Sequence, residues 1–179
     1  MQKIGEYELI DPAEKYKKLI LNWRNSDHVR MNMFIEHLIT EEEHGKWFEN
    51  VKKGNKIIAK LLLFKEKPIG FVNFTNIDYQ NNKCYWGFYI GEKEAPKGSG
   101  KIMALLALDY IFEDFHLRKL CSEVLEFNSK SIKFHQKLRF EEEGRLEKHI
   151  FKNNYYVDVI VMALFRENWG RSKEQLLKK

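Results

Sequence analysis

Two glycines flanked by lysines stand immediately before a long apolar segment in the stretch EAPKGSGKIMALLALDYIF, residues 94–112. The apolar run predicts a helix, and the first N–H groups of a helix have no partner within it. Gly98 and Gly100 allow the backbone to approach a bound anion closely, and Lys97 and Lys101 add positive charge. The stretch therefore predicts a phosphate-binding turn. The alternative is a flexible strand-to-helix turn that binds nothing.

The elements that must position this turn are an alternation of strands and helices. Short apolar and aromatic runs bounded by turn residues predict the strands, and helical periodicity with capping residues predicts the helices. The clearest helix begins with a capping box, Thr40 and Glu43, and ends at Gly54. The predicted order is a strand at 7–10, helices at 12–22 and 40–54, strands at 56–64, 68–78 and 83–91, a helix at 99–115, a strand at 119–125, a helix at 129–138, and strands around 140–147 and 155–165. Three strands in a row indicate an antiparallel meander directly before the glycine turn.

Composition limits the class of protein and its partners. The 179 residues, with 44% hydrophobic and 14% aromatic content, indicate one globular domain. The net charge of +5 favours an anionic partner. Because the basic residues are dispersed among acidic ones, we expect no nucleic-acid partner.

Cys84 and Cys121 match neither a disulfide framework nor a metal site, and no metal is expected. The sequence shows no signal peptide and no membrane span, so we expect a cytoplasmic protein without a membrane partner.

This order of elements, with a GxG turn opening the central helix, resembles the GNAT superfamily of acetyl-CoA-dependent N-acetyltransferases. The family's pyrophosphate motif is Q/R-x-x-G-x-G/A, and its counterpart here is Ala95-Pro96-Lys97-Gly98-Ser99-Gly100. Ala95 stands where the family has a basic or amide residue, and Lys97 can supply the missing charge. The resemblance implies an α/β (α+β) fold, with a central, mixed and mostly antiparallel seven-stranded sheet flanked by helices on both faces. It also implies a single domain over residues 1–179, with a polar C-terminal tail from about 166.

A second stretch, VLEFNSKSIKFHQKLRFEEEG at 124–144, is similar to the GNAT pattern N-x-x-[AS]-I-x-[FL]-Y. The resemblance implies that acetyl-CoA, as donor substrate, is held by Phe88, Ile90, Lys97, Gly98, Ser99, Gly100, Lys101, Asn128, Ser131, Phe134 and Lys137. Backbone groups near Tyr89 and Ile90 would stabilise the oxyanion. His135 replaces the family's tyrosine, which is thought to protonate the departing CoA thiolate. An imidazolium can do the same near neutral pH. The alternative is that His135 packs against the pantetheine arm and water supplies the proton.

The segments LILNWRNSDHVRMNMF and ITEEEHGKWFENV resemble a GNAT branch that includes ribosomal-protein Nα-acetyltransferases and the PseH-type enzymes of pseudaminic acid synthesis. The PseH resemblance covers nearly the whole chain and implies acetylation of the 4-amine of UDP-4-amino-4,6-dideoxy-N-acetyl-β-L-altrosamine. The residues that match the nucleotide-sugar pocket are Arg24, Met33, His44, Trp47, Asn73, Thr75 and Tyr89. Simpler interpretations remain open. Arg24 could form a surface ion pair, Met33 and Trp47 could be core residues, and His44 could be a solvated side chain.

The implied mechanism is direct attack of the amine on the thioester in a ternary complex, with no cysteine nucleophile. The general base is unassigned, with Asp78, Glu123 and Glu126 as titratable candidates. Three further alternatives stay open: an acetyltransferase of protein N-termini, a non-catalytic CoA-binding module, and either a monomer or a homodimer.

Overall fold

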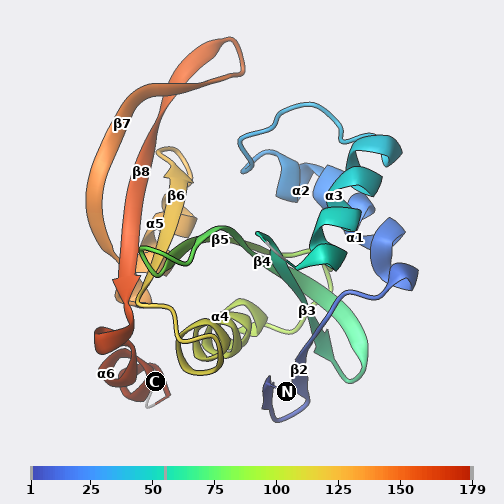
Figure 1. Ribbon diagram of the computed structural model, residues 1–179. Coiled ribbons are helices and arrows are strands. Elements are labelled where there is room, and N and C mark those ends of the chain that lie inside the picture. The colour runs from blue at the N-terminus through green and yellow to red at the C-terminus, as the bar shows by residue number, and fades with distance from the viewer. Residues whose placement is uncertain (1, 55, 178–179) are drawn as a thin grey trace.

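An eight-stranded mixed sheet forms the centre of the protein in a computed structural model that describes residues 2–54 and 56–177 (Figure 1). The strands follow the order β1-β2-β3-β4-β5-β6-β8-β7, and only the pair β5 and β6 is parallel. Their bounds are β1 Gln2–Ile4, β2 Tyr7–Ile10, β3 Ile58–Phe64, β4 Lys67–Asp78, β5 Lys83–Ile90, β6 Lys119–Leu125, β7 Glu141–Lys152 and β8 Tyr155–Phe165. The predicted fold class is confirmed, but the count of seven strands is corrected to eight. The additional strand is the short edge strand β1, which pairs with β2 across a turn at Gly5.

The helices largely follow the predicted positions. They are α1 Lys17–Asn25, α2 Asp27–Arg30, α3 Glu41–Lys53, α4 Ser99–Asp109, α5 Ser129–Lys137 and α6 Arg166–Leu177, with a 3-10 turn at Glu14–Tyr16 and a π-helical turn at Tyr110–Asp114. The capping box of Thr40 and Glu43 opens α3, and Gly54 ends it in the left-handed conformation with φ 67°. Helix α2 and helix α6 were not predicted.

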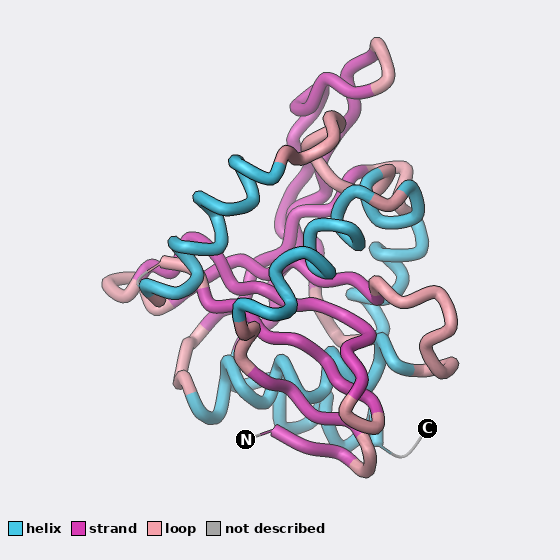
Figure 2. The backbone as a smooth tube through the Cα atoms, turned by 90° about the vertical axis from the view of Figure 1, so that its right-hand side faces the viewer, coloured by secondary structure: helices cyan, strands magenta, loops and turns pink. Residues whose placement is uncertain are grey.

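Helices cover the two faces of the sheet, as the perpendicular views of Figures 1 and 2 show. Alternation along β4 explains this arrangement, because successive side chains of a strand point to opposite faces. Phe71 packs into a cluster with Ile20 and Trp23 of α1 and Phe48 of α3. Val72, its neighbour in β4, packs into the larger cluster that contains residues 103–108 of α4. One face of the sheet therefore carries α1 and α3, and the other carries α4.

The sheet opens between β5 and β6. These strands pair only at Lys83–Lys119, Cys84–Leu120 and Tyr85–Cys121, so the rest of each strand faces its neighbour without backbone pairing. The glycine turn and α4 follow directly after β5, and α5 follows β6. The opening is thus bordered by the segments in which sequence analysis placed the donor site.

Residues 166–177 form helix α6 instead of a simple polar tail. Trp169 is 1% exposed, and its Nε1–H donates a hydrogen bond of 2.9 Å to Asp109 at the end of α4. Lys173 forms an ion pair with the same carboxylate. One buried indole therefore fixes a helix whose composition is otherwise polar. Residues 178–179 of the expected tail lie outside the described residues.

Candidate active site

The glycine turn opens α4 in a backbone conformation that depends on glycine. Gly98 is the N-cap of α4, with φ 92° and ψ −8°, a conformation that residues with a Cβ rarely adopt. Ser99 is buried, and its hydroxyl donates a hydrogen bond of 2.7 Å to the Pro96 carbonyl. The Ser99 side chain therefore stabilises the turn from within. The backbone N–H of Ser99 also donates to the Pro96 carbonyl, at 3.1 Å, so both donors of Ser99 are engaged within the turn, while Lys97 is exposed beside it.

A cleft of about 530 Å³ lies along the opening between β5 and β6. It brings together six of the eleven predicted donor residues, Phe88, Ile90, Gly100, Asn128, Ser131 and Phe134, with Tyr89 and His135, which were predicted as catalytic. Asn128 caps α5 by accepting a hydrogen bond of 3.1 Å from the Ser131 N–H. Lys97, Gly98, Ser99, Lys101 and Lys137 do not line this cleft. Lys101 and Lys137 instead line an adjoining cavity of about 720 Å³, which Phe134 shares and to which α6 contributes Ser172 and Leu176.

His135 is held as a neutral ring. Its Nδ1 lies 2.8 Å from the Ser131 carbonyl oxygen, so this nitrogen carries the proton, and Nε2 accepts a hydrogen bond from the Ser122 hydroxyl at 2.8 Å. Burial lowers the pKa of His135 from 6.5 to about 4, although the Ser131 carbonyl acts in the opposite direction. The imidazolium that a general acid needs is therefore disfavoured at neutral pH. The geometry weighs against the proton-donor hypothesis and favours the packing alternative.

A second cavity, of about 330 Å³, lies on the α1–α3 side of the sheet, and we call it the acceptor pocket. Six of the seven predicted acceptor residues line it: Arg24, Met33, His44, Trp47, Asn73 and Tyr89. Thr75 is the exception, because it lines a neighbouring cavity together with Trp47, Lys53 and Lys56. Sequence reasoning missed Ile20, Ile35, Ile39, Glu43 and Phe71. Glu43 carried a sequence signal only as half of the capping box. The four apolar residues carried none beyond their proximity to predicted residues, since apolar side chains of this kind are ordinary core residues.

The acceptor pocket and the donor cleft adjoin one another. Met33, Gly87, Phe88 and Tyr89 line both cavities. The shared part of β5 is the segment that β6 leaves unpaired. A donor in one cavity and an acceptor in the other would therefore meet at β5.

Arg24 places an unneutralised charge against the acceptor pocket. Its Nη1 is buried and has no hydrogen-bond partner among the described residues. Burial lowers the pKa of Arg24, and the nearby Arg30 acts in the same direction, while Tyr89 opposes both. Burial likewise raises the pKa of the Tyr89 phenol, so this group stays neutral. Arg24 does not form the surface ion pair that was one reading of the sequence.

An aromatic wall completes the acceptor pocket. His44 stacks on Trp47 with ring centroids 5.1 Å apart, Trp47 meets Phe71 edge-on at 5.7 Å, and Phe71 stacks on Tyr89 at 5.5 Å. His44 is 5% exposed and donates from Nε2 to the Lys17 carbonyl at 2.9 Å, so it is not the solvated side chain of the simpler reading. Burial lowers the pKa of His44 and favours its neutral form.

Of the three general-base candidates, Glu123 is the one that lines the donor cleft. Asp78 accepts hydrogen bonds from Asn81, and Glu126 forms an ion pair with Arg145. The two thiols are poor nucleophiles, because burial raises the pKa of Cys84 to about 12 and raises that of Cys121 as well.

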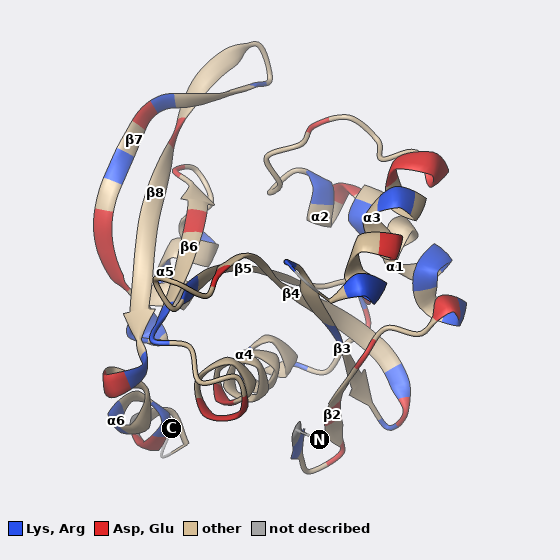
Figure 3. Cartoon of the chain, viewed as in Figure 1, with Lys and Arg blue, Asp and Glu red and all other residues tan. Residues whose placement is uncertain are grey.

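Other kinds of site find little support in the described part of the chain. No group of three or more His, Cys, Asp or Glu side chains gathers there in a way that could hold a metal ion. Lysines and arginines are interspersed with acidic residues over α3 and β7, as Figure 3 shows. Across residues 2–54 and 56–177, every helix is too short or too polar to cross a membrane.

Comparison with known proteins identifies the family. Residues 13–161 match the profile of the acetyltransferase (GNAT) domain. The chain belongs to this family of acetyl-CoA-dependent N-acetyltransferases. The Vibrio cholerae spermidine N-acetyltransferase, solved in complex with CoA and spermine, superposes with a TM-score of 0.86 over 92% of this chain and 98% of its own. At 23% identity this likeness shows the fold alone.

Several relatives with different names match this GNAT chain. Acetyltransferase PseH of Campylobacter jejuni is 30% identical over 124 residues, which are 69% of this chain and 75% of that protein. The prophage-derived uncharacterized N-acetyltransferase YokL of Bacillus subtilis is 33% identical over 56% of this chain and 57% of its own length. Spermidine N(1)-acetyltransferase of Vibrio cholerae is 29% identical over 59% of this chain and 61% of its own. The matches to the last two relatives thus span less than two thirds of their lengths.

Proposed function

We propose that this GNAT protein transfers the acetyl group of acetyl-CoA to the 4-amine of UDP-4-amino-4,6-dideoxy-N-acetyl-β-L-altrosamine. The unpartnered guanidinium of Arg24 in the acceptor pocket is the observation that carries the proposal. Arg24 is half-buried, with Nη1 fully buried and unpartnered among the described residues; this is costly in the free protein, and an anionic ligand group removes that cost. A planar guanidinium binds two phosphate oxygens at once, and the wall of Trp47 and Phe71 suits a flat base.

The charge at Arg24 also bears on the other acceptors that the relatives' names suggest. A polyamine is a cation and would meet Arg24 with the same sign of charge, so this pocket disfavours it. A protein N-terminus brings an ammonium group and a continuing chain, neither of which neutralises Arg24. The diphosphate of a nucleotide carries the negative charge that neutralises Arg24.

In the proposed mechanism the amine attacks the thioester directly, where the acceptor pocket meets the donor cleft at β5. Glu123 accepts the proton that the amine loses, through a water molecule. The backbone of β5 near Tyr89 and Ile90, on the side that β6 leaves unpaired, stabilises the oxyanion. The carbon–sulfur bond then breaks. Because His135 is neutral and both its nitrogens are engaged, the CoA thiolate takes its proton from water.

Ligand-dependent melting followed by turnover tests the proposal. UDP should raise the melting temperature of the wild-type protein, whereas spermidine and an alanine-initiated tetrapeptide should not. Release of CoA thiol should then be observed with acetyl-CoA and the UDP-4-amino sugar. Arg24→Met should abolish the UDP shift and retain the shift caused by acetyl-CoA. Arg24→Lys is the matched control, because it keeps the charge without the fork and should keep part of the shift.

Turnover of spermidine or the peptide without turnover of the sugar nucleotide would contradict the proposed acceptor. A UDP shift that is unchanged in Arg24→Met would contradict the assigned role of Arg24.

A further inference from the structure

One wall of the acceptor pocket is a segment without helix or strand, residues 31–39, which we call the pocket loop. It contributes Met33, Ile35 and Ile39 to the lining, and Met33 also lines the donor cleft. Because such a segment has no secondary structure of its own, its position depends on the few contacts that anchor it.

Both ends of the pocket loop are anchored by the preceding helices. The side chain of Asn25 forms two hydrogen bonds of 2.8 Å with the backbone of Ile39, one to the N–H and one to the carbonyl. At the other end, the Met33 N–H donates to the Arg30 carbonyl at 3.0 Å. These contacts fix where the loop starts and finishes. The middle of the loop depends on other contacts.

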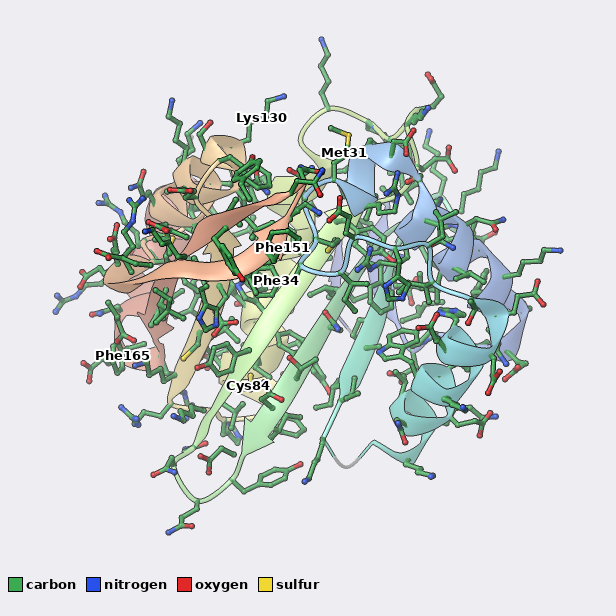
Figure 4. All side chains as sticks on the ribbon, turned by 90° about the horizontal axis from the view of Figure 1, so that it is seen from above. Met31, Phe34, Cys84, Lys130, Phe151 and Phe165 are labelled. Carbon is green, nitrogen blue, oxygen red and sulfur yellow. The ribbon has the colours of Figure 1, made fainter. Side chains whose placement is uncertain are left out.

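The middle of the pocket loop is held by Arg30, whose Nη1 donates to the Glu36 carbonyl at 3.0 Å, and by the β7–β8 hairpin, which lies more than a hundred residues away in sequence. The Nζ of Lys152 donates to the Met33 carbonyl at 3.1 Å, and the Asn153 N–H donates to the Glu36 carboxylate at 3.3 Å. Phe34 packs against buried residues of β6 and β8: Leu125, Val157 and Val159. Figure 1 shows the hairpin extending beyond the rest of the sheet, and Figure 4 labels the two segments at Phe34 and Phe151.

Lys152 is unusual among the lysines because it is 2% exposed. Its ammonium group donates to a single acceptor among the described residues, the Met33 carbonyl. Burying an ammonium group is unfavourable unless it is hydrogen-bonded. The arrangement is therefore stable only while the pocket loop is seated against the hairpin.

We propose that Lys152 is a positioning residue that seats the pocket loop and thereby limits the size of the acceptor. The identity of the pocket as the acceptor site rests on the proposed function, while the seating of the loop does not. With the loop seated, Met33, Ile35 and Ile39 close one side of the pocket. This admits a compact acceptor and excludes a chain that must continue past Met33. Lys152 lines neither the acceptor pocket nor the donor cleft, and it acts through the Met33 backbone.

Hydrogen–deuterium exchange tests the seating directly. The variant is Lys152→Met, which keeps the aliphatic length and removes the charge. The matched control is Lys148→Met on the same strand, whose side chain is exposed and whose contact to Asp158 comes from its backbone N–H. Amides of residues 31–39 should exchange at least about fivefold faster in Lys152→Met, because a charged donor has been lost, and at the wild-type rate in the control. Glu36→Ala, which removes the second contact, should shift exchange in the same direction.

Kinetics then test the effect on the acceptor. Lys152→Met should raise the KM for the UDP-4-amino sugar severalfold without changing the KM for acetyl-CoA. It should also raise the turnover of an alanine-initiated tetrapeptide relative to that of the sugar. Unchanged exchange over residues 31–39 would overturn the seating role, and faster exchange with unchanged acceptor preference would overturn the size limit. If the wild-type protein turns over no sugar nucleotide, the proposed acceptor fails, and the exchange arm still decides the role of Lys152.

Discussion

The buried ring of His135 should make the stability of the protein depend on pH in a way that one substitution removes. In the unfolded chain this histidine binds a proton at its ordinary pKa of 6.5, and in the folded protein only at about 4. Between these two values the unfolded state binds more protons, so stability is lost as the pH falls from 6.5 toward 4. His135→Phe keeps a ring at this position and cannot titrate.

The magnitude follows from the two pKa values. At pH 5 the unfolded histidine is almost fully protonated and the folded one is almost fully neutral, so the wild-type protein should lose about 2 kcal/mol of unfolding free energy relative to pH 7.5 from this one group. The same fall in pH should lower the unfolding free energy of His135→Phe by about 2 kcal/mol less than it lowers that of the wild type. Its absolute stability at pH 7.5 will also differ, because the Ser122 hydroxyl loses its acceptor. The change in unfolding free energy between pH 7.5 and pH 5 does not depend on that effect.

Urea unfolding followed by circular dichroism at pH 5.0, 6.0 and 7.5 measures this difference. His149→Phe is the matched control, because it makes the same substitution at an exposed position of β7. Equal pH dependence in the wild type and His135→Phe would refute the reasoning. It would mean that the ring is charged in the folded protein, and it would restore the hypothesis that His135 protonates the leaving thiolate.

Three further predictions concern the donor cleft and its surroundings. Gly98→Ala should lower the unfolding free energy by about 1 kcal/mol, because its φ is 92°, and raise the KM for acetyl-CoA. Gly100→Ala, whose Cβ would lie 4.0 Å from Ile90, serves as the stability control for urea unfolding. In Gly91→Ala the added Cβ would overlap the ring of Trp23, so the unfolding free energy should fall by about 3 kcal/mol. Wild-type stability of this variant in urea unfolding would contradict the packing of Trp23 on Gly91. Glu123→Gln should lower kcat about tenfold or more while leaving the KM for acetyl-CoA unchanged, and an unchanged kcat would remove Glu123 as the base.

Much of the fold was predictable because its signals are local. The capping box of Thr40 and Glu43 is formed by residues three apart, and Gly98 lies next to the helix that it caps. Strand β6 and strand β8 match their predicted ranges, since continuous apolar runs bounded by turn residues mark buried strands. Strand β1 carried no comparable signal, because it spans three residues and pairs only at the edge of the sheet.

The site was predictable as a set of residues but not as an arrangement. Arg24, His44 and Asn73 were chosen from short motifs, and the structure brings them to one pocket. Thr75 follows Asn73 by two residues in β4 and was expected beside it, yet it lines the neighbouring cavity. The boundary between two cavities is set by the side chains that fill the space, in this case Trp47, which lines both. A strand's alternation places residues on a face and does not place them in a cavity.

The sequence by itself determined the GNAT fold class, the glycine turn that precedes α4 and the residue types available to each substrate. These depend on periodicity, capping and turn chemistry, which act over a few residues. Only the tertiary structure decided the state of His135, because burial and the contacts with Ser122 and Ser131 lower its pKa. It also decided that Arg24 lacks a partner and that Lys152 reaches Met33. Each of these depends on which groups long-range packing brings together and which it separates from water.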